Sequence, residues 1–348
     1  MADMKSLAMA LDNSGMLGYL RNFPTDLAGA WDRAPTWDLS SIQDKQYSGV
    51  ICLGMGGSAS SGDFLSCLSE LDGCLPFISH RGYDLPTWVS ENWLVIATSY
   101  SGNTEETLDA LDAAIELGCD VIGLSSGGKM QVLLESTGKL WIGLPGGQPP
   151  RSAFGHIFGT QVALVWRLGI LSPPENLGSI LERLSDAVEA CDFTIDDAEG
   201  DVITEIAASL LGKQISVVST QSLGPVAYRT VCQLNENSGV FARPHIIPEM
   251  NHNEIVAWGE KDAVSNQALL LFNWDGAHER NNMRIEWFLE HIEIEPTWGI
   301  MCEGDSHLEA LLYAVIMMDW LSCGIALLGG KDPTAIGPIT GLKDYLSQ

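Results

Sequence analysis

Short apolar runs alternate with longer segments of helical character through the first half of the chain. Runs typical of buried strands lie at residues 50–53, 74–79, 94–99, 120–124 and 139–144. Helical segments separate or follow them, at 105–117 and 153–168 among others. Strands that alternate with helices at this spacing indicate a parallel sheet with helices on both faces. The pattern therefore predicts the α/β fold class.

The second half repeats this order after a polar break, Ser172-Pro-Pro-Glu-Asn. Its predicted elements are helices at 177–190 and 202–211, strands at 215–219, 269–272 and 295–301, and a long helix at 307–327. The strands that begin at Ile215 and Leu269 are followed by turns and helices, as are those at Val50 and Leu94. We therefore predict two similar domains, 1–172 and 173–348, the first with a helical extension over its first 48 residues.

Two turns of small and hydroxylated residues follow the first and third strands, with the sequences GMGGSASSG and SYSGNT. In a parallel sheet both turns fall at the carboxyl ends of the strands, where ligands bind. A strand, a tight turn and a helix N-terminus together present several N–H groups and hydroxyls to a phosphate. Neither turn is a P-loop or a GxGxxG dinucleotide motif. Ordinary turns and helix caps are the alternative, which one turn alone would favour.

The chain carries 45 acidic and 18 basic residues, a net charge of −27, and 46% of its 348 residues are hydrophobic. This composition predicts a packed core. The charge argues against nucleic acid and anionic membranes as partners, because both require a basic face. A small anionic metabolite stays possible where local dipoles and one or two cations override the global field. The acidity itself is typical of a saline habitat or of simple solubility.

Eight cysteines occur without a CxxC pair or a short His/Cys cluster. We therefore expect reduced thiols in a cytoplasmic protein, without a zinc site or a disulfide framework. The N-terminal residues lack the apolar core of a signal peptide. The longest apolar stretches, such as 311–317, fall short of a membrane span.

Four motifs, GMGGSASSGDF, TSYSGNTEET, LNENSG and PEMNHNEI, occur in this order over nearly the whole chain. Together they resemble the bifunctional phosphoglucose/phosphomannose isomerases, which belong to the sugar isomerase (SIS) superfamily and carry two SIS domains per chain. The last two motifs are the more specific. The first departs from the family's usual GMGGSAIGGD at Ser60 and Ser61, which stay small. The resemblance implies two SIS-type, flavodoxin-like domains, each with a parallel sheet flanked by helices.

The resemblance also implies a set of residues that bind the substrate's phosphate. They lie in the two hydroxyl-rich turns and are Gly56, Gly57, Ser58, Ser99, Ser101 and Thr104.

Glu236 and His252 lie in the two more specific motifs. The resemblance implies that Glu236 carries a proton between C1 and C2 of the sugar, for which partial burial would suit its pKa. It implies that His252 opens the sugar ring, as an imidazole can near neutral pH. By composition alone Glu236 is one acid among 45, and a single histidine is more often structural. No second ligand lies at metal spacing from His252, so we expect no metal.

Arg151 and Lys343 match two cationic positions of the family. Arg151 follows a Gly- and Pro-rich break, and its permanent charge suits a developing enediolate oxygen. A surface ion pair is the alternative. Lys343 would assist ring opening or neutralise charge, although terminal lysines are usually solvated. His156 is a weaker candidate and is better interpreted as a helix residue. Thr334 lies near the C-terminal region that, in the family that the chain resembles, bears on mannose versus glucose epimers.

The resemblance implies a cofactor-free cytoplasmic isomerase of glycolysis and gluconeogenesis. It would convert glucose 6-phosphate, and also mannose 6-phosphate, to fructose 6-phosphate through a cis-enediol. It would form a homodimer in which His252 reaches the neighbouring subunit's site. Two alternatives stay open: an isomerase of another sugar phosphate, such as an amino sugar, and a non-catalytic sugar-phosphate sensor. The sensor would need neither Glu236 nor His252.

Overall fold

The computed structural model describes residues 3–195 and 202–346. Its contacts divide the chain into two compact units. The N-terminal unit is Asn22–Leu181, and the C-terminal unit combines Met1–Arg21 with Glu182–Gln348. The predicted domain limits at residues 172 and 173 stay a prediction, and the compact units divide the chain at different places.

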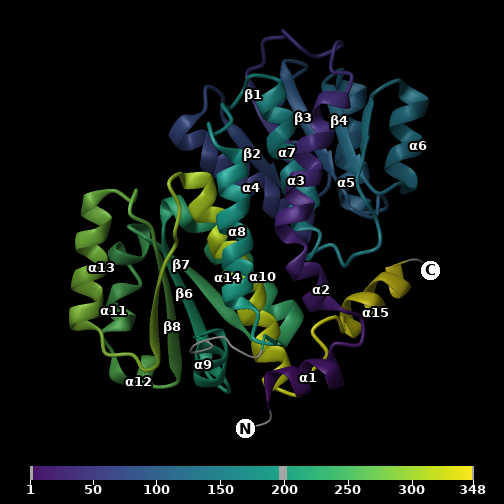
Figure 1. Ribbon diagram of the computed structural model, residues 1–348. Helices are drawn as coiled ribbons and strands as arrows, with labels where there is room; N and C mark the ends of the chain where they lie inside the picture. The colour runs from purple at the N-terminus through teal and green to yellow at the C-terminus, as the bar shows by residue number, and fades with distance from the viewer. Residues whose placement is uncertain (1–2, 196–201, 347–348) are drawn as a thin grey trace. The chain divides into compact units, whose positions relative to one another are not determined.

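The N-terminal unit holds a five-stranded sheet in the order β2-β1-β3-β4-β5, in which every neighbouring pair is parallel. Its strands are β1 (Gly49–Leu53), β2 (Phe77–His80), β3 (Trp93–Thr98), β4 (Asp120–Ser125) and β5 (Leu140–Gly143). This strand order is that of flavodoxin-like folds, and the strand order reverses between β1 and β3. The predicted α/β class and flavodoxin-like topology are confirmed (Figure 1).

Helices cover both faces of this sheet. They are α3 (Phe23–Arg33), α4 (Gly56–Asp72), α5 (Glu105–Leu117), α6 (Gly128–Thr137) and α7 (Phe154–Arg167), with a short 3₁₀ turn η1 (Ala34–Thr36). Apolar residues of α5 and α6 form one core with β1, β3 and β4, which includes Leu53, Ala97 and Leu111. On the other face Phe64 of α4 packs against Phe154 and Phe158 of α7.

The C-terminal unit holds a four-stranded parallel sheet in the order β7-β6-β8-β9. Its strands are β6 (Gln214–Thr220), β7 (Ala242–Ile247), β8 (Gln267–Asn273) and β9 (Thr297–Met301). The sequence pattern did not predict β7. Arg243 and Pro244 break its apolar character, and a proline is tolerated there because β7 is an edge strand.

Helices make up most of the rest of this unit. They are α1 (Met4–Leu11), α2 (Met16–Arg21), α8 (Leu177–Cys191, which starts in the N-terminal unit), α9 (Val202–Leu210), α10 (Gly224–Gln233), α11 (Ile255–Trp258), α12 (Lys261–Val264), α13 (Glu279–His291), α14 (His307–Leu328) and α15 (Gly337–Leu346). Short helical turns are η2 (Gln221–Leu223), η3 (Leu234–Ser238) and η4 (Glu249–His252). Residues 1–21 belong to this unit because α1 and α2 contact α14. Arg21 also pairs with Asp192, at 2.6 Å between Nε and Oδ2.

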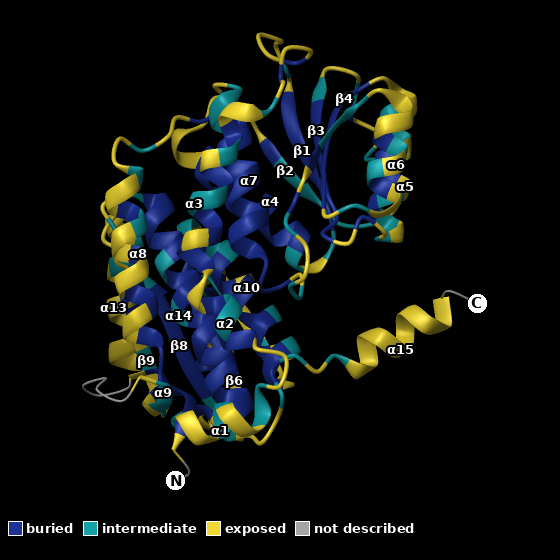
Figure 2. Ribbon diagram, turned by 45° about the vertical axis from the view of Figure 1, so that its right-hand side comes forward, coloured by how far each residue is buried: buried dark blue, intermediate teal, exposed yellow. Residues whose placement is uncertain are grey.

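The helix α14 lies at the centre of the C-terminal unit and is buried along most of its length (Figure 2). It is long and apolar enough to cross a membrane by length and composition alone. The expectation that no apolar stretch reaches that length is therefore wrong. Because 83% of its most apolar window is buried inside the protein, we interpret α14 as a core helix.

Candidate active site

The first hydroxyl-rich turn is the start of α4, which begins directly after β1. Gly56, Gly57 and Ser58 form the first turn of this helix rather than a separate loop. Gly56 has a φ of +53°, a conformation that glycine adopts without strain. The first N–H groups of a helix have no partner within the helix, and the helix dipole is positive there. No acidic residue lies in this first turn, so the N-terminus of α4 is a favourable position for an anion.

The second hydroxyl-rich turn connects β3 to α5 and is closed by its own hydrogen bonds. The hydroxyls of Ser99 and Thr104 lie 2.8 Å apart, and Thr104 N donates to Ser99 Oγ at 3.2 Å. Ser99 is fully buried, whereas Ser101 is exposed at the tip of the turn. Of these three, Ser101 is therefore the most accessible to a ligand. Two acids, Glu105 and Glu106, occupy the first turn of α5, which makes the start of α5 a poorer anion site than that of α4.

A hydrogen bond joins the two turns. The backbone N–H of Tyr100 donates to Ser58 Oγ over 3.2 Å, and both groups are buried. Because β1 and β3 are neighbours in the sheet, both turns lie at its carboxyl edge where the strand order reverses. This is the position at which open α/β sheets bind ligands.

Arg151 lies near the end of the loop between β5 and α7, and its side chain is buried. The alternative of a surface ion pair is therefore wrong. The loop presses against the start of α4. A Cβ on Gly57 would lie 3.1 Å from Pro150 O and 3.3 Å from Arg151 Cα. The structure thus brings Arg151 next to the first turn of α4 and hence to the predicted phosphate-side residues.

Tyr100 is a residue that the sequence reasoning missed. Its hydroxyl donates to Pro145 O at 2.8 Å and lies 3.4 Å from the N–H of Gln148. Tyr100 therefore connects the second turn both to Ser58 and to the loop that carries Arg151. The one signal in the sequence is a large aromatic residue inside a turn of otherwise small residues.

Glu236 lies in the C-terminal unit on a π-helical turn, η3, that continues α10. It is half-buried. The sequence predicted a helix end here, but not the wider turn, which is frequent at functional sites. The turn is fixed to α14 because Asn237 Nδ2 donates to Ser322 Oγ at 2.8 Å.

A buried ion pair fixes the helix that leads to this turn. Asp319 of α14 accepts hydrogen bonds from Arg229 and from Gln233 of α10, both at 2.6 Å. All three residues are at most 4% exposed. The backbone before Glu236 is therefore held by charged and neutral contacts on one residue of the central helix.

His252 and Lys343 occupy exposed positions of the C-terminal unit. His252 ends η4, whose neighbour Met250 is buried and anchors the turn. Lys343 lies on α15, a helix without any buried residue (Figure 2). The predicted site residues are divided between the two units. The N-terminal unit carries Gly56, Gly57, Ser58, Ser99, Ser101, Thr104 and Arg151, and the C-terminal unit carries Glu236, His252 and Lys343. The roles of all these residues stay predictions, as does the absence of a metal.

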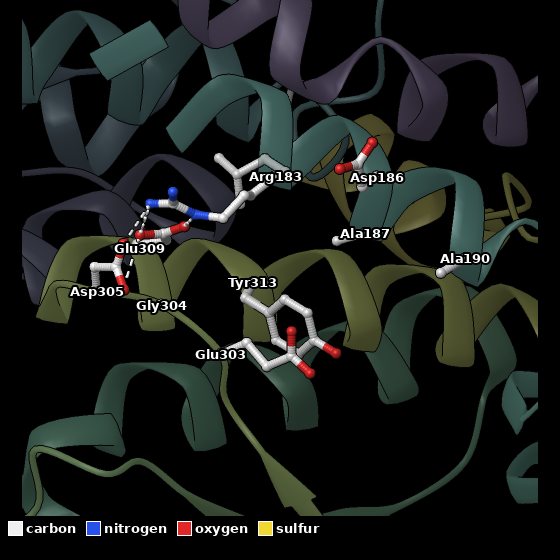
Figure 3. A pocket seen from close by; sticks show the side chains of 10 residues that line it. Arg183, Asp186, Ala187, Ala190, Glu303, Gly304, Asp305, Glu309 and Tyr313 are labelled. Atoms are coloured by element: carbon white, nitrogen blue, oxygen red, sulfur yellow. Dashed lines mark hydrogen bonds and ion pairs between the residues drawn. The ribbon is translucent and has the colours of Figure 1, made fainter. Parts of the chain in front are cut away.

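A separate pocket of about 460 Å³ lies in the C-terminal unit between α8 and α14 (Figure 3). Arg183, one of the lining residues, pairs with Glu309 and, at 3.2 Å, with Asp305. Burial, together with nearby Glu303, raises the pKa of Tyr313 to about 12, so its hydroxyl stays neutral. The described residues that line this pocket include none of the predicted site residues.

Comparisons with known proteins agree with the motifs. The family "Bacterial phospho-glucose isomerase C-terminal SIS domain" matches residues 201–346. A bifunctional phosphoglucose/phosphomannose isomerase of Aquifex aeolicus is 32% identical over 87% of this chain and 91% of its own length. A protein of the same description from Caldicellulosiruptor bescii is 30% identical over 94% and 97%, respectively. A hypothetical protein from Thermus thermophilus shares the fold, with a TM-score of 0.73 at 16% identity over 99% of this chain and 92% of its own.

Proposed function

This chain belongs to the bifunctional phosphoglucose/phosphomannose isomerase family, and from that premise we propose that it interconverts glucose 6-phosphate and mannose 6-phosphate with fructose 6-phosphate. The observation that carries the proposal is the meeting of both hydroxyl-rich turns at the point where the strand order of the N-terminal sheet reverses. Binding of a phosphorylated ligand is the chemistry which that position supports best.

The start of α4 and the second turn would hold the phosphate. N–H groups of the first helical turn and the hydroxyls of Ser58, Ser101 and Thr104 supply donors. The positive end of the helix dipole and the cation of Arg151 offset locally the net charge of −27. Long-range repulsion is screened by salt beyond about 10 Å, so this local field decides binding.

Proton transfer would fall to Glu236. In the forward direction its carboxylate takes the proton from C2 of the open-chain aldose and returns it to C1, while a proton moves from the C2 hydroxyl to the C1 oxygen. The intermediate is a cis-enediol, whose developing negative charge Arg151 stabilises. His252, with Lys343, would open the ring beforehand. Glucose and mannose 6-phosphates share this intermediate and differ only in the face that is reprotonated at C2.

We also propose that the protein is a cytoplasmic homodimer whose subunits share active sites, and that it serves glycolysis and gluconeogenesis. His252 is exposed on its own unit, which suits a role in a partner's site. Phe241 and Val256, on either side of it in the sequence, are 91% and 73% exposed and would be covered in a dimer. None of the eight cysteines forms a disulfide, a state that a reducing compartment favours.

Incubation with fructose 6-phosphate in D₂O, followed by NMR, tests the proposal. Glucose and mannose 6-phosphates that carry deuterium at C2 would support both activities and a proton transfer that exchanges with solvent. Glucose 6-phosphate alone would restrict the enzyme to one activity. Binding without turnover would favour the sensor. A parallel incubation with glucosamine 6-phosphate tests the amino-sugar alternative.

A further inference from the structure

A buried polar cluster lies beside the loop that carries Arg151. It consists of Asp26 on α3, His156 on α7 and Gln148 in the loop itself. Gln148 Nε2 donates to Asp26 Oδ2 at 3.0 Å and lies 3.3 Å from His156 Nε2. His156 Nε2 is also 3.3 Å from Asp26 Oδ1. The three side chains therefore lie in mutual polar contact. Because His156 Nε2 cannot accept from Gln148 and donate to Asp26 at once, the hydrogen bond from Gln148 to Asp26 is the one that fixes the amide.

The two helical members of the cluster are held rigidly. Asp26 and His156 are each 8% exposed. Their helices pack so closely that a Cβ on Gly155 would lie 2.9 Å from Asp26 Cβ. Phe23 and Phe154 stack beside them, with ring centroids 6.5 Å apart. Gln148, by contrast, belongs to a loop and is only half-buried, so the helices fix the loop rather than the reverse.

The backbone between Gln148 and Arg151 is stiff. Pro149 and Pro150 lie between them, and each fixes its own φ near −65°. Pro149 O accepts from both the N–H and the hydroxyl of Ser152, at 3.0 and 2.9 Å. A displacement of Gln148 is therefore passed along the loop to Arg151 rather than absorbed within it.

Burial sets the charge of the cluster. It lowers the pKa of His156, although Asp26 opposes the shift, so the imidazole is neutral at pH 7. Burial likewise raises the pKa of Asp26, against the hydrogen bond from Gln148. Burial of a carboxyl group costs folding free energy unless hydrogen-bond donors surround it. Two apolar side chains in place of Asp26 and His156 would pack as well. What the cluster adds is a defined position for the Gln148 amide.

We propose that Gln148 is a positioning residue for Arg151, and that Asp26 and His156 hold it in place. This inference rests on the proposed function, in which Arg151 stabilises the enediolate. Gln148 does not itself touch the sugar phosphate. Its hydrogen bonds set where the Arg151 guanidinium stands relative to the first turn of α4.

The first test is Gln148→Met, which keeps the size of the side chain and removes its donors. A catalytic group that is misplaced by about 1 Å can cost about 100-fold in rate. We therefore expect kcat to fall about 10- to 100-fold. We expect KM to change less than about threefold, because the direct phosphate contacts lie in the two turns and a shifted Arg151 keeps its positive charge near them.

Two further variants and a control accompany it. Asp26→Leu removes the acceptor of the Gln148 hydrogen bond, and it should likewise lower kcat with little change in KM. Asp26→Asn keeps an acceptor oxygen, and its kcat should be close to that of the wild type. Gln131→Met is the matched control. Gln131 donates to Glu135 on the exposed side of α6 in the same unit, and its replacement should behave as wild type.

A double-mutant cycle separates positioning from general loss of structure. If Gln148 acts through Arg151, Gln148→Met should lower kcat no further in an Arg151→Ala background. A merely structural role would instead multiply the two losses and would lower Tm in proportion. The positioning role would be overturned if kcat were unchanged in Gln148→Met and Asp26→Leu, or if the two losses multiplied. The proposed function would still stand in that case, provided that the wild type turns over the substrate. A wild type without turnover would overturn both.

Discussion

The carbonyl oxygen of Pro150 lies against Gly57, in the first turn of α4, so closely that a methyl group there would make an unusually tight contact. A Cβ there would lie 3.1 Å from that oxygen and 3.3 Å from Arg151 Cα. Both neighbours are backbone atoms, which cannot rotate away as a side chain can. The start of α4 and the loop that carries Arg151 therefore share one contact surface.

Gly57→Ala should accordingly move the loop away from α4 and lower kcat at least tenfold, which corresponds to about 1.4 kcal/mol of transition-state stabilisation. Steady-state kinetics and thermal unfolding measure the two effects. Gly178→Ala is the matched control. Gly178 is also the second residue of a long helix, α8, but a Cβ added to it would meet nothing within 4 Å. It should keep wild-type kinetics and gain stability from alanine's higher helix propensity. Equal behaviour of the two variants would contradict the contact.

Glu236→Gln replaces the proposed base with a neutral group of the same shape. Removal of a general base typically costs 100- to 10,000-fold, so we expect kcat to fall by about that factor. Substrate affinity, measured by calorimetry, should stay close to wild type, because the phosphate is bound elsewhere. Glu290→Gln, on the exposed face of α13, serves as the control. Near-normal turnover of Glu236→Gln would remove this residue from the mechanism.

Asp319→Asn breaks the buried pair with Arg229, whose side chain is 4% exposed. A buried guanidinium that loses its counter-charge costs about 3 to 5 kcal/mol of unfolding free energy, which urea titration measures. Asp305→Asn provides the comparison. Asp305 also pairs with an arginine, but its side chain is 87% exposed, and such pairs contribute about 0 to 1 kcal/mol. If both variants lost the same stability, the pair with Arg229 would not be the anchor of α10.

Asp192 makes the stability of the C-terminal unit depend on pH. Burial raises the pKa of this carboxyl, but hydrogen bonds from Arg21 and Thr194 outweigh burial and hold the pKa below its usual value. A carboxyl with a depressed pKa stabilises the fold above its unfolded pKa, about 4, and this contribution is lost as the pH falls through the folded value. Asp192→Asn should therefore be less stable than wild type at pH 7, and the gap should close below about pH 4. A gap that is constant with pH would contradict the ion pair with Arg21.

The sequence pattern predicted the buried strands well, because strands covered on both faces are apolar throughout. Val50–Leu53 and Leu269–Phe272 fall within β1 and β8 for this reason. It could not find β7, whose polar and proline residues are tolerated only because the strand lies at an edge. Whether a strand lies at the edge depends on how the whole sheet assembles, and a short segment of sequence does not contain that information.

The candidate site was predictable as a set of residues but not as an arrangement. The motifs drew attention to Ser58, Glu236 and Arg151. The burial of Arg151 and the π-helical turn under Glu236 follow from contacts with α4 and α14, which lie far away in the sequence. Tyr100 lies inside a motif that gave it no role, and Gln148 lies in none of the four motifs; the importance of both lies in the groups they reach in the folded chain. The residues 1–21 show the same limit, since an amphipathic pattern predicts a buried face but not the helix that covers it.

The packing of α1 and α2 on α14 has a consequence for biosynthesis. A ribosome that has made residues 22–181 has delivered the N-terminal unit as one continuous piece. The C-terminal unit remains open until the helix His307–Leu328 emerges, because that helix is the surface on which α1 and α2 close. The first two helices thus depend on a helix near the other end of the chain. Until that helix emerges, Met16, Leu17 and Leu20, which are buried in the finished protein, lack the helix against which α1 and α2 pack.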